Sequence, residues 1–206
     1  KYKVKLAEYN IFSLNRQERR GGGVAVLVKK SIQATQLALP QPPNLEAIGV
    51  TCTLRGTDLD VVSVYCPHGN MCSEEDIRLI FNTTRETAIV AGDFNAHSHW
   101  NDNRWNDNRR SNRAGSAIEE YLLENNKFSL ATPRNLKTRR NTNNNRFSFS
   151  TIDLTFITAN LAQSFTTHSG PTDWSSDHIP IISELAIRVV PQILKPLNWS
   201  FVDHSW

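Results

Sequence analysis

The sequence predicts an α+β fold with a largely antiparallel sheet arrangement. Segments of apolar alternation, which are typical of strands, outnumber the segments with helical periodicity. Several neighbouring strand segments are separated by only a few turn residues, which favours hairpins. With 206 residues, 39% of them hydrophobic and 21% charged, the chain is long enough to bury the core of one large domain.

Three strands are expected in the first third of the chain. Apolar alternation places them at Gly23 to Val28, Leu45 to Leu54 and Leu59 to Cys66. The last two are separated by Arg-Gly-Thr-Asp at residues 55–58, which has the composition of a turn. The second and third strands are therefore expected to form a hairpin.

A short apolar run follows, from Ala88 to Asp93, and it ends in Gly-Asp. A run of this kind is typical of a strand that is buried on both faces. A weak helix is expected before it, between Ser73 and Phe81. The buried strand would carry the Asp93 carboxylate at its end.

The clearest helix is expected near residue 120, where Ile118, Tyr121 and Leu122 recur at helical spacing. Ser116 is its candidate N-cap, and the asparagine pair at 125–126 is its stop signal. Further strands are expected at Phe128 to Ala131, Thr151 to Ile157, Ser164 to His168 and Ile179 to Ile187.

Residues 1–190 are expected to form one domain, because no interdomain linker is recognisable inside this range. Residues 191–206 contain two prolines followed by aromatic residues and resemble the start of a linker. The apolar runs are shorter than the ~18 to 20 residues of a membrane span, and the first twenty residues do not resemble a secretion signal. Three cysteines argue against a disulfide framework and fit a reducing, intracellular compartment.

The net charge of +3 is shared by many soluble proteins and says little about partners. The distribution is more informative, because one strip of thirteen residues holds five cations, five asparagines and no acid. Such a strip attracts phosphate backbones, although a solvated connector can have the same composition. The candidate DNA-binding residues are Arg134, Lys137, Arg139, Arg140 and Arg146.

The segment Gly-Asp-Phe-Asn-Ala-His at residues 92–97 places Asp93 and Asn95 two positions apart at a strand end, so both side chains point to the same side. A carboxylate that orients or deprotonates water, beside an amide that holds the water and a phosphate oxygen, suits phosphodiester hydrolysis. An Asp-x-Asn at a strand end can also be only a turn.

Two further motifs bring acids and an imidazole to strands. Ser-Asp-His-Ile-Pro at residues 176–180 holds Asp177 and His178, and Thr-Ile-Asp-Leu-Thr-Phe at residues 151–156 sets Asp153 inside an apolar strand. An isolated charge is costly to bury, so a buried Asp153 requires a partner. His178 is the natural candidate for that partner.

Together these three motifs resemble the endonuclease/exonuclease/phosphatase superfamily, which includes pancreatic deoxyribonuclease and the abasic-site endonucleases. More narrowly, they are similar to the endonuclease domain that jockey-type non-long-terminal-repeat retrotransposons carry ahead of their reverse transcriptase. The resemblance covers roughly residues 8 to 188 and includes Gly21 to Val28 and Val61 to Pro67. It implies a four-layered α/β sandwich with two packed sheets flanked by helices. The family's first two strands have no counterpart here, so the sandwich is expected to be amino-terminally truncated.

The resemblance also implies roles for the residues that match the family's motifs. Asp93 would activate the water, and Asn95 would position the water or the phosphate. His178 would stabilise the developing negative charge while Asp153 orients its imidazole. Tyr65 occupies the position of the family's phosphate-contacting tyrosine.

A divalent metal ion is implied as well, and Mg²⁺, with Mn²⁺ as the alternative, is the expected cofactor. Asp177 matches an acid near the metal, and Asp93 and Asn95 are the other candidate ligands. Carboxylate oxygens suit a hard cation such as Mg²⁺, which would neutralise the leaving oxygen. The family's metal-binding glutamate has no match in this sequence.

The function that the resemblance implies is a Mg²⁺-dependent DNA endonuclease that nicks target DNA for retrotransposon integration by target-primed reverse transcription. The expected partners are double-stranded DNA, which would be chromosomal DNA in the nucleus, and a reverse transcriptase domain in the same polypeptide. No membrane and no small-molecule cofactor are expected. One alternative is a catalytically impaired DNA-binding remnant, and another is a phosphoesterase that acts on a small phosphoester.

Overall fold

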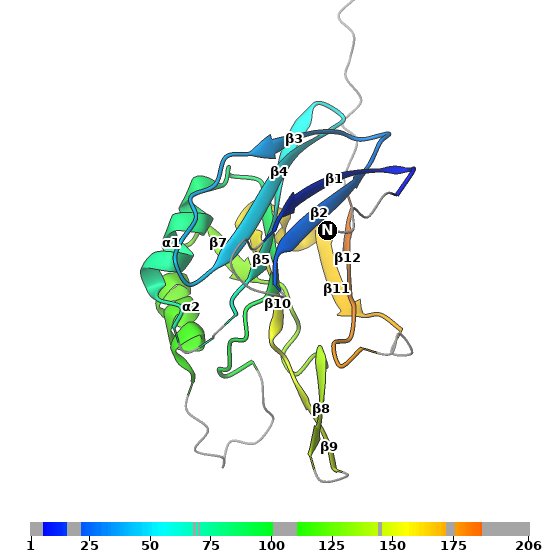
Figure 1. Cartoon of the computed structure of the whole chain (residues 1–206). Helices are drawn as coiled ribbons and strands as arrows, with labels where there is room; N and C mark the ends of the chain where they lie inside the picture. Colours follow the sequence, from blue (N-terminus) through cyan, green and yellow to red (C-terminus); the bar gives the residue numbers. More distant parts are fainter. Residues whose placement is uncertain are drawn as a thin grey trace, which may run out of the picture.

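A mixed six-stranded sheet lies at the centre of the computed structural model (Figure 1). The structure describes residues 6–15, 22–67, 69, 71–100, 111–143, 146–171 and 176–186. The sheet has the order β3-β4-β5-β6-β10-β7, and every neighbouring pair is antiparallel except β5 and β6. The largely antiparallel arrangement is thereby confirmed. The strands are β3 (Gln33–Leu37), β4 (Glu46–Leu54), β5 (Thr57–Tyr65), β6 (Ala88–Asp93), β7 (Phe128–Leu130) and β10 (Asp153–Thr158).

Two helices, α1 (Glu74–Thr83) and α2 (Arg113–Glu124), pack side by side against one face of this sheet (Figure 1). Helix α1 connects β5 to β6, as a crossover between parallel strands requires. It begins at a capping box in which Ser73 and Asp76 satisfy each other's backbone N–H groups. None of the helices in the described ranges is long and apolar enough to cross a membrane.

Helix α2 begins four residues earlier than predicted, because Asn112 and not Ser116 is its N-cap. The Asn112 side chain accepts the backbone N–H of Gly115 at 2.9 Å and also that of His97 at 2.9 Å. This second contact fastens the start of α2 to the loop after β6, a long-range contact that local sequence does not reveal. The helix ends as predicted, with Asn125 as its C-cap.

The opposite face of the sheet is covered by two two-stranded ribbons (Figure 1). One ribbon pairs β1 (Tyr9–Leu14) with β2 (Val24–Lys29), and the other pairs β11 (Phe165–Ser169) with β12 (Ile181–Leu185). A short 3-10 helix, η1 (Ala159–Ser164), joins β10 to β11. The two helices, the sheet and the ribbons form three layers. Both α-helices of the described residues lie on the same face, so the fourth layer of the sandwich stays a prediction.

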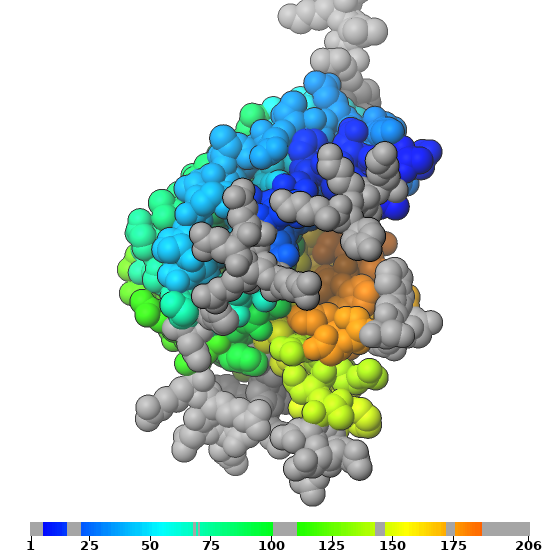
Figure 2. Space-filling view, viewed as in Figure 1, coloured from blue at the N-terminus to red at the C-terminus, as the bar shows by residue number. Residues whose placement is uncertain are grey.

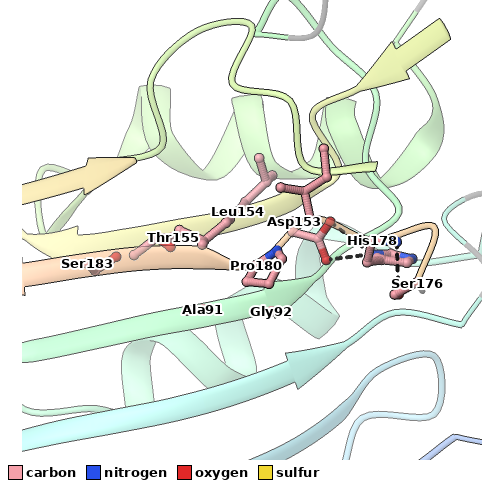
Figure 3. Close-up of a pocket in the computed structure, with 11 residues that line it drawn as sticks. Ala91, Gly92, Asp153, Leu154, Thr155, Ser176, His178, Pro180 and Ser183 are labelled. Carbon is pink, nitrogen blue, oxygen red and sulfur yellow. Dashed lines mark hydrogen bonds and ion pairs between the residues drawn. The ribbon is translucent and has the colours of Figure 1, made fainter. Parts of the chain in front are cut away.

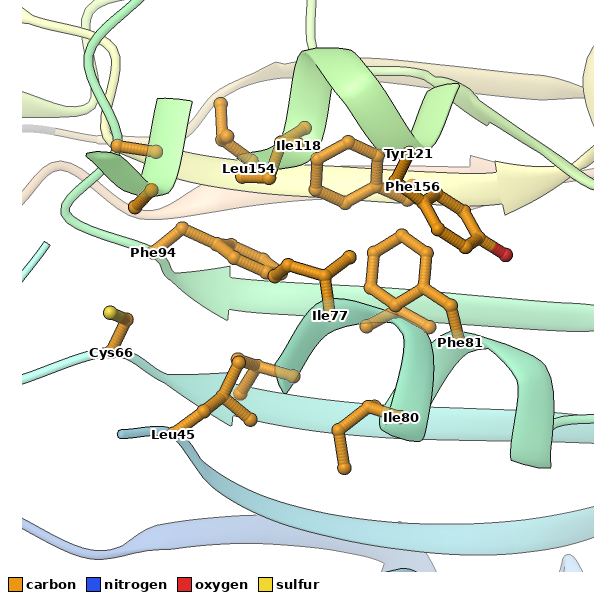
Figure 4. Close-up of a cluster of buried hydrophobic side chains, with 14 of the residues drawn as sticks. Leu45, Cys66, Ile77, Ile80, Phe81, Phe94, Ile118, Tyr121, Leu154 and Phe156 are labelled. Carbon is orange, nitrogen blue, oxygen red and sulfur yellow. The ribbon is translucent and has the colours of Figure 1, made fainter. Parts of the chain in front are cut away.

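Alternation along each central strand decides which side chain faces which layer. On β5, Val62 packs toward the helices and Val61 toward the ribbons. The core on the helix side is rich in aromatic rings, and Figure 4 shows Phe81 among Tyr121 and Phe156. Their ring centroids lie 5.1 and 5.2 Å from that of Phe81, within the favourable range for aromatic pairs. This rigid layer supports the strand ends that carry the candidate site.

A separate hairpin, β8 (Arg139–Asn143) and β9 (Arg146–Ser150), projects from the edge of the molecule, as Figures 1 and 2 show in yellow-green. It falls in the strip of cations and asparagines. At its base Arg139 forms an isolated antiparallel bridge with His178. The hairpin is therefore attached to the segment that carries the candidate imidazole.

Candidate active site

Three of the candidate residues lie in one row across the central sheet. Tyr65 at the end of β5 is the register partner of Asp93 at the end of β6, and Asp93 is the register partner of Asp153 at the start of β10. Register partners project from the same face of a sheet. Their neighbours Val64 and Leu154 face the helices, so the row faces the ribbons. Register thus gathers residues from three distant segments at one end of the sheet.

Glu46 belongs to the same row, although the sequence analysis did not single it out. It begins β4 and is the register partner of Tyr65. Its Oε2 accepts the backbone N–H of Gly23 at 2.6 Å, which connects the row to the chain just before β2. The sequence predicts the turn at residues 55–58, whereas the structure has a two-residue loop at Arg55-Gly56, and this shorter loop fixes which residue of β4 pairs with Tyr65.

The backbone after β6 is shaped by Gly92 and Asn95. A Cβ on Gly92 would lie 1.8 Å from the carbonyl oxygen of Val64, so only glycine fits there. Asn95 has a φ of 46°, its N–H donates to Oδ1 of Asp93 at 2.9 Å, and its Nδ2 donates to the carbonyl oxygen of Cys66 at 2.9 Å. These contacts form a tight turn that holds the Asp93 carboxylate and the Asn95 amide side by side.

Asp153 and His178 are paired, as the sequence predicts. The Nδ1 atom of His178 lies 3.1 Å from Oδ1 and 3.0 Å from Oδ2 of Asp153, and Figure 3 shows both side chains together. Because a carboxylate can only accept, Nδ1 carries the proton. The other ring nitrogen, Nε2, lies 4.0 Å from Oδ2 of Asp93. The imidazole therefore stands between the two carboxylates.

The charged residues of this group shift one another's pKa values. The hydrogen bond to Asp153 raises the pKa of His178 above its ordinary value, and the carboxylates around the ring add to the rise. Burial raises the pKa of Asp93, and the nearby charge of Asp153 raises it further. Perturbed pKa values in one cluster are typical of functional sites.

The same three residues could hold a metal ion. Asp93, Asp153 and His178 each offer one ligand atom, and these atoms all lie within 4.8 Å of one another. Of the predicted metal ligands, only Asp93 belongs to this group. Asn95 directs its Nδ2 to a backbone carbonyl, and the Asp177 carboxylate accepts from Nε of Arg139 at 3.0 Å. Two carboxylates that face each other fit a divalent cation, which prefers oxygen ligands.

A pocket of about 490 Å³ opens beside the Asp153–His178 pair, between β6, β10 and β12 (Figure 3). Small residues such as Gly92 and Thr155 are among those that line it. The Ser176 hydroxyl at its rim accepts the N–H of His178 at 3.1 Å, which orients the loop that carries the imidazole. The site is open to solvent on the ribbon side of the sheet.

Four of the five predicted DNA-binding residues have side chains in the described part of the structure, and these four divide into two groups. Arg134 is exposed and donates from Nε to the carbonyl oxygen of His99 at 2.9 Å, and Arg139 is bound to Asp177. Lys137 and Arg140 are exposed near the base of the hairpin. Arg146 begins β9, and its side chain lies outside the described part of the structure.

Two phenylalanines of β9 accompany the exposed cations. Lys137 Nζ lies 4.5 Å from the ring centroid of Phe149, and the Arg140 guanidinium lies 5.9 Å from that of Phe147. Phe147 is 65% exposed and Phe149 is 44% exposed, although both are large apolar side chains. Solvent-exposed aromatic rings beside cations are typical of a binding surface.

Comparison with known proteins agrees with this geometry. Residues 59–182 match the family model described as "Endonuclease-reverse transcriptase". The structure is similar to the endonuclease domain of TRAS1, a telomere-specific non-LTR retrotransposon, with a TM-score of 0.69 and 17% identity over 89% of this chain and 83% of that chain. It is also similar to the AP endonuclease LMAP from Leishmania major, with a TM-score of 0.65 and 14% identity over 88% of this chain and 72% of that chain.

A third similar structure is an endonuclease/exonuclease/phosphatase family protein from Leptotrichia buccalis, with a TM-score of 0.60 and 17% identity over 87% of this chain and 72% of that chain. No significant match was found among curated proteins. At these identities the structural matches establish a shared fold, which is that of the endonuclease/exonuclease/phosphatase superfamily.

The raised pKa of His178 predicts a pH-dependent stability. A histidine whose folded-state pKa is raised contributes stability that is fully present below its unfolded pKa of about 6.5, and this stability is lost as the pH rises through the folded-state pKa. Asp153→Asn removes the main cause of the raised pKa of His178. We expect the variant to lose more unfolding free energy, relative to the parent, at about pH 6 than at about pH 9.

Chemical denaturation of both proteins in EDTA at the two pH values measures this difference. Asp58→Asn is the control, because the exposed Asp58 pairs with Arg85, which does not titrate in this range. An equal loss for Asp153→Asn at both pH values would show that the pair does not stabilise the imidazolium.

Proposed function

This chain belongs to the endonuclease-reverse transcriptase family, and on that premise we propose that it is a Mg²⁺-dependent DNA endonuclease that nicks target DNA for retrotransposon integration by target-primed reverse transcription. The observation that carries the proposal is the Asp153–His178 pair beside Asp93 at the open end of the sheet. An oriented imidazole and a second carboxylate are the groups that phosphodiester hydrolysis needs. Mn²⁺ is the alternative cofactor.

The residues of the site have distinct tasks in this reaction. Asp93, held by the turn at Asn95, accepts a proton from the attacking water. As an imidazolium, the form that its pairing with Asp153 favours, His178 donates from Nε2 toward the phosphate and stabilises the negative charge that develops there, while Asp153 fixes its orientation. Tyr65 contacts the phosphate from the adjacent strand end.

The carboxylates of Asp93 and Asp153 would hold the metal ion, with Asn95 and Asp177 as further candidates. When bound, Mg²⁺ supplies positive charge that favours departure of the leaving oxygen. Burial of Asp93 makes a negative cluster without such a cation costly, which agrees with the raised pKa of its carboxyl.

The substrate is proposed to be double-stranded DNA. The β8–β9 hairpin projects from the edge of the molecule (Figure 1), and the exposed phenylalanines on it and the cations beside them do not line the pocket that holds the dyad, so they suit a polymer better than a small phosphoester. The reverse transcriptase that uses the nicked end is proposed to be part of the same polypeptide, and the reaction is proposed to take place on chromosomal DNA in the nucleus.

Two assays separate this function from the phosphoesterase alternative. We expect the protein with Mg²⁺ to convert supercoiled plasmid into nicked circles and to release no phosphate from inositol phosphates. Phosphate release without plasmid nicking would select the phosphoesterase. The controls are the same reactions with EDTA.

Removal of the hairpin cations is expected to weaken DNA binding in a salt-dependent way. Lys137→Gln combined with Arg140→Gln neutralises two exposed cations and leaves the Arg139–Asp177 contact intact. Each lost phosphate contact lowers the slope of log affinity against log salt by about 0.9, so the slope should flatten by up to roughly two units.

Fluorescence anisotropy with a labelled duplex at several salt concentrations measures the slope. Arg55→Gln, in the turn at the far end of β5, is the control and should leave the slope unchanged. If the double variant binds like the parent at every salt concentration, the hairpin is only an exposed connector.

A further inference from the structure

One buried threonine joins both members of the Asp153–His178 pair. Thr138 is 0% exposed and immediately precedes β8. Its Oγ1 accepts the backbone N–H of Ile152 at 3.0 Å and that of Asp153 at 3.1 Å. Its backbone carbonyl accepts the N–H of Ile179 at 2.7 Å. The same residue therefore holds the backbone at Asp153 and the backbone next to His178.

Neighbouring contacts strengthen this junction. The N–H of Arg140 donates to the carbonyl oxygen of Asp177 at 2.7 Å, and Arg139 forms the bridge with His178. The Thr138 hydroxyl donates in turn to the carbonyl oxygen of Ser150 at 3.3 Å, which closes the base of the hairpin. Residues 138–140 thus bind the segment 177–179 on one side and the start of β10 on the other.

The geometry points to Thr138 as a positioning residue for the Asp153–His178 pair. Its hydroxyl holds the backbone at Asp153, and its carbonyl oxygen holds the backbone at Ile179, next to His178. This inference rests on the proposed function, because it assigns the pair a reaction to perform. Thr138 does not touch the pocket and is not a lining residue, so it acts through the dyad.

The physical reason is the cost of an unmet hydrogen bond. Buried backbone N–H groups are nearly always paired, and two of them depend on the one Oγ1 of Thr138. Without that acceptor the start of β10 must move to find another one. A displacement of about 1 Å at a catalytic group can lower a rate ~10²-fold.

The chain contains a matched control for this contact. Thr132 is 3% exposed, and its Oγ1 accepts the N–H of Thr155 at 2.7 Å. It therefore makes the same kind of bond to the same strand, two residues beyond Asp153. A merely structural role for Thr138 predicts that loss of either hydroxyl has the same consequences.

Thr138→Val, Thr138→Ser and Thr132→Val in the same chain provide the test. We expect Thr138→Val to lower kcat for plasmid nicking by at least about tenfold with little change in KM, because binding contacts remain while the dyad is displaced. Thr138→Ser keeps the hydroxyl and should restore kcat to within about threefold of the parent. Thr132→Val should lower the melting temperature but leave kcat unchanged.

Two measurements that do not depend on activity accompany the kinetics. In the parent and in Thr138→Ser, the Nδ1 proton of His178 should give a downfield NMR resonance and the amide of Asp153 should be protected from exchange. In Thr138→Val both signals should be lost, whereas Thr132→Val should retain them. These NMR signals test the positioning role of Thr138 even if the parent does not nick DNA. Failure of the positioning role can therefore be distinguished from failure of the proposed endonuclease function.

Equal effects of Thr138→Val and Thr132→Val on kcat, or an unchanged Nδ1 resonance in Thr138→Val, would overturn the inference. If Thr138→Val does not fold, Thr138→Ala replaces it with the same expected results, because it also removes the Oγ1 acceptor of the two N–H groups and adds no methyl group in its place. Failure of Thr138→Ser to restore the Nδ1 resonance would also contradict the role of the hydroxyl.

Discussion

Replacing His178 with alanine is expected to lower the rate of DNA nicking by ~10²- to 10³-fold, the loss typical of removing one group that stabilises developing negative charge. The imidazole is held by Asp153 at 3.0 Å and stands beside Asp93, where the charge of the transition state would develop. Its interaction is stronger in the transition state than in the ground state, so kcat should fall while the affinity for DNA changes little.

Single-turnover nicking and duplex binding, measured on the same preparation, separate these two effects. His168→Ala is the matched control, because His168 is an exposed histidine of β11 that neither belongs to the Asp93–Asp153–His178 group nor lines the pocket. If His178→Ala retained more than about a tenth of the parent rate, His178 would have no chemical role at this site.

The second large effect is expected for Asp93→Asn, which keeps the shape of the side chain and removes its charge. The variant loses the base that accepts the proton of water and one of the two carboxylates that would hold the metal ion. We expect nicking to fall by at least ~10²-fold and the affinity for Mg²⁺ to fall as well. The turn should persist, because the amide oxygen can still accept the N–H of Asn95.

Plasmid nicking and calorimetric titration with Mg²⁺ measure the two losses. Asp58→Asn, at the start of β5 and therefore at the opposite end of the strand from Tyr65, is the control and should change neither. Normal nicking by Asp93→Asn would require another base and would remove Asp93 from the mechanism.

Much of this site could be predicted from the sequence because its signals are local. The glycine before Asp93 and the apolar run that leads to it mark a buried strand end, and the structure ends β6 at that residue. A carboxylate inside an apolar strand requires a partner, and Asp153 has that partner in His178. The expected burial of these residues and the alternation along the strands were sufficient to predict both the strand end at Asp93 and the pairing of Asp153 with His178.

Other parts depend on contacts that local sequence does not carry. The strands β1 and β3 were not predicted. Strand β1 belongs to a two-stranded ribbon and β3 is the edge strand of the central sheet, and contacts with β4 stabilise both. The start of α2 depends on the bond between Asn112 and His97. In the sequence, nothing distinguishes Thr138 from the other polar residues of its strip. Its contacts with the start of β10 and with Ile179 exist only in the folded chain.

The sequence of the strip does not distinguish a loop from the hairpin that β8 and β9 form. The residues of β8 are all polar, so no apolar face indicates a strand there, although Phe147 and Phe149 of β9 alternate with serines. What fixes it is the junction at its base, where Arg139 pairs with His178. The element that is proposed to hold DNA is thereby connected to the residues that are proposed to cleave it.

The most direct test of the account is the incubation of supercoiled plasmid with the protein and Mg²⁺, followed by extension of the nicked circles with a DNA polymerase. The account predicts nicked circles whose ends are 3′ hydroxyls that the polymerase extends, and no nicking in EDTA. Binding of DNA that persists in EDTA, with no nicked circles at any Mg²⁺ concentration, would contradict it and identify the protein as a non-catalytic DNA-binding remnant.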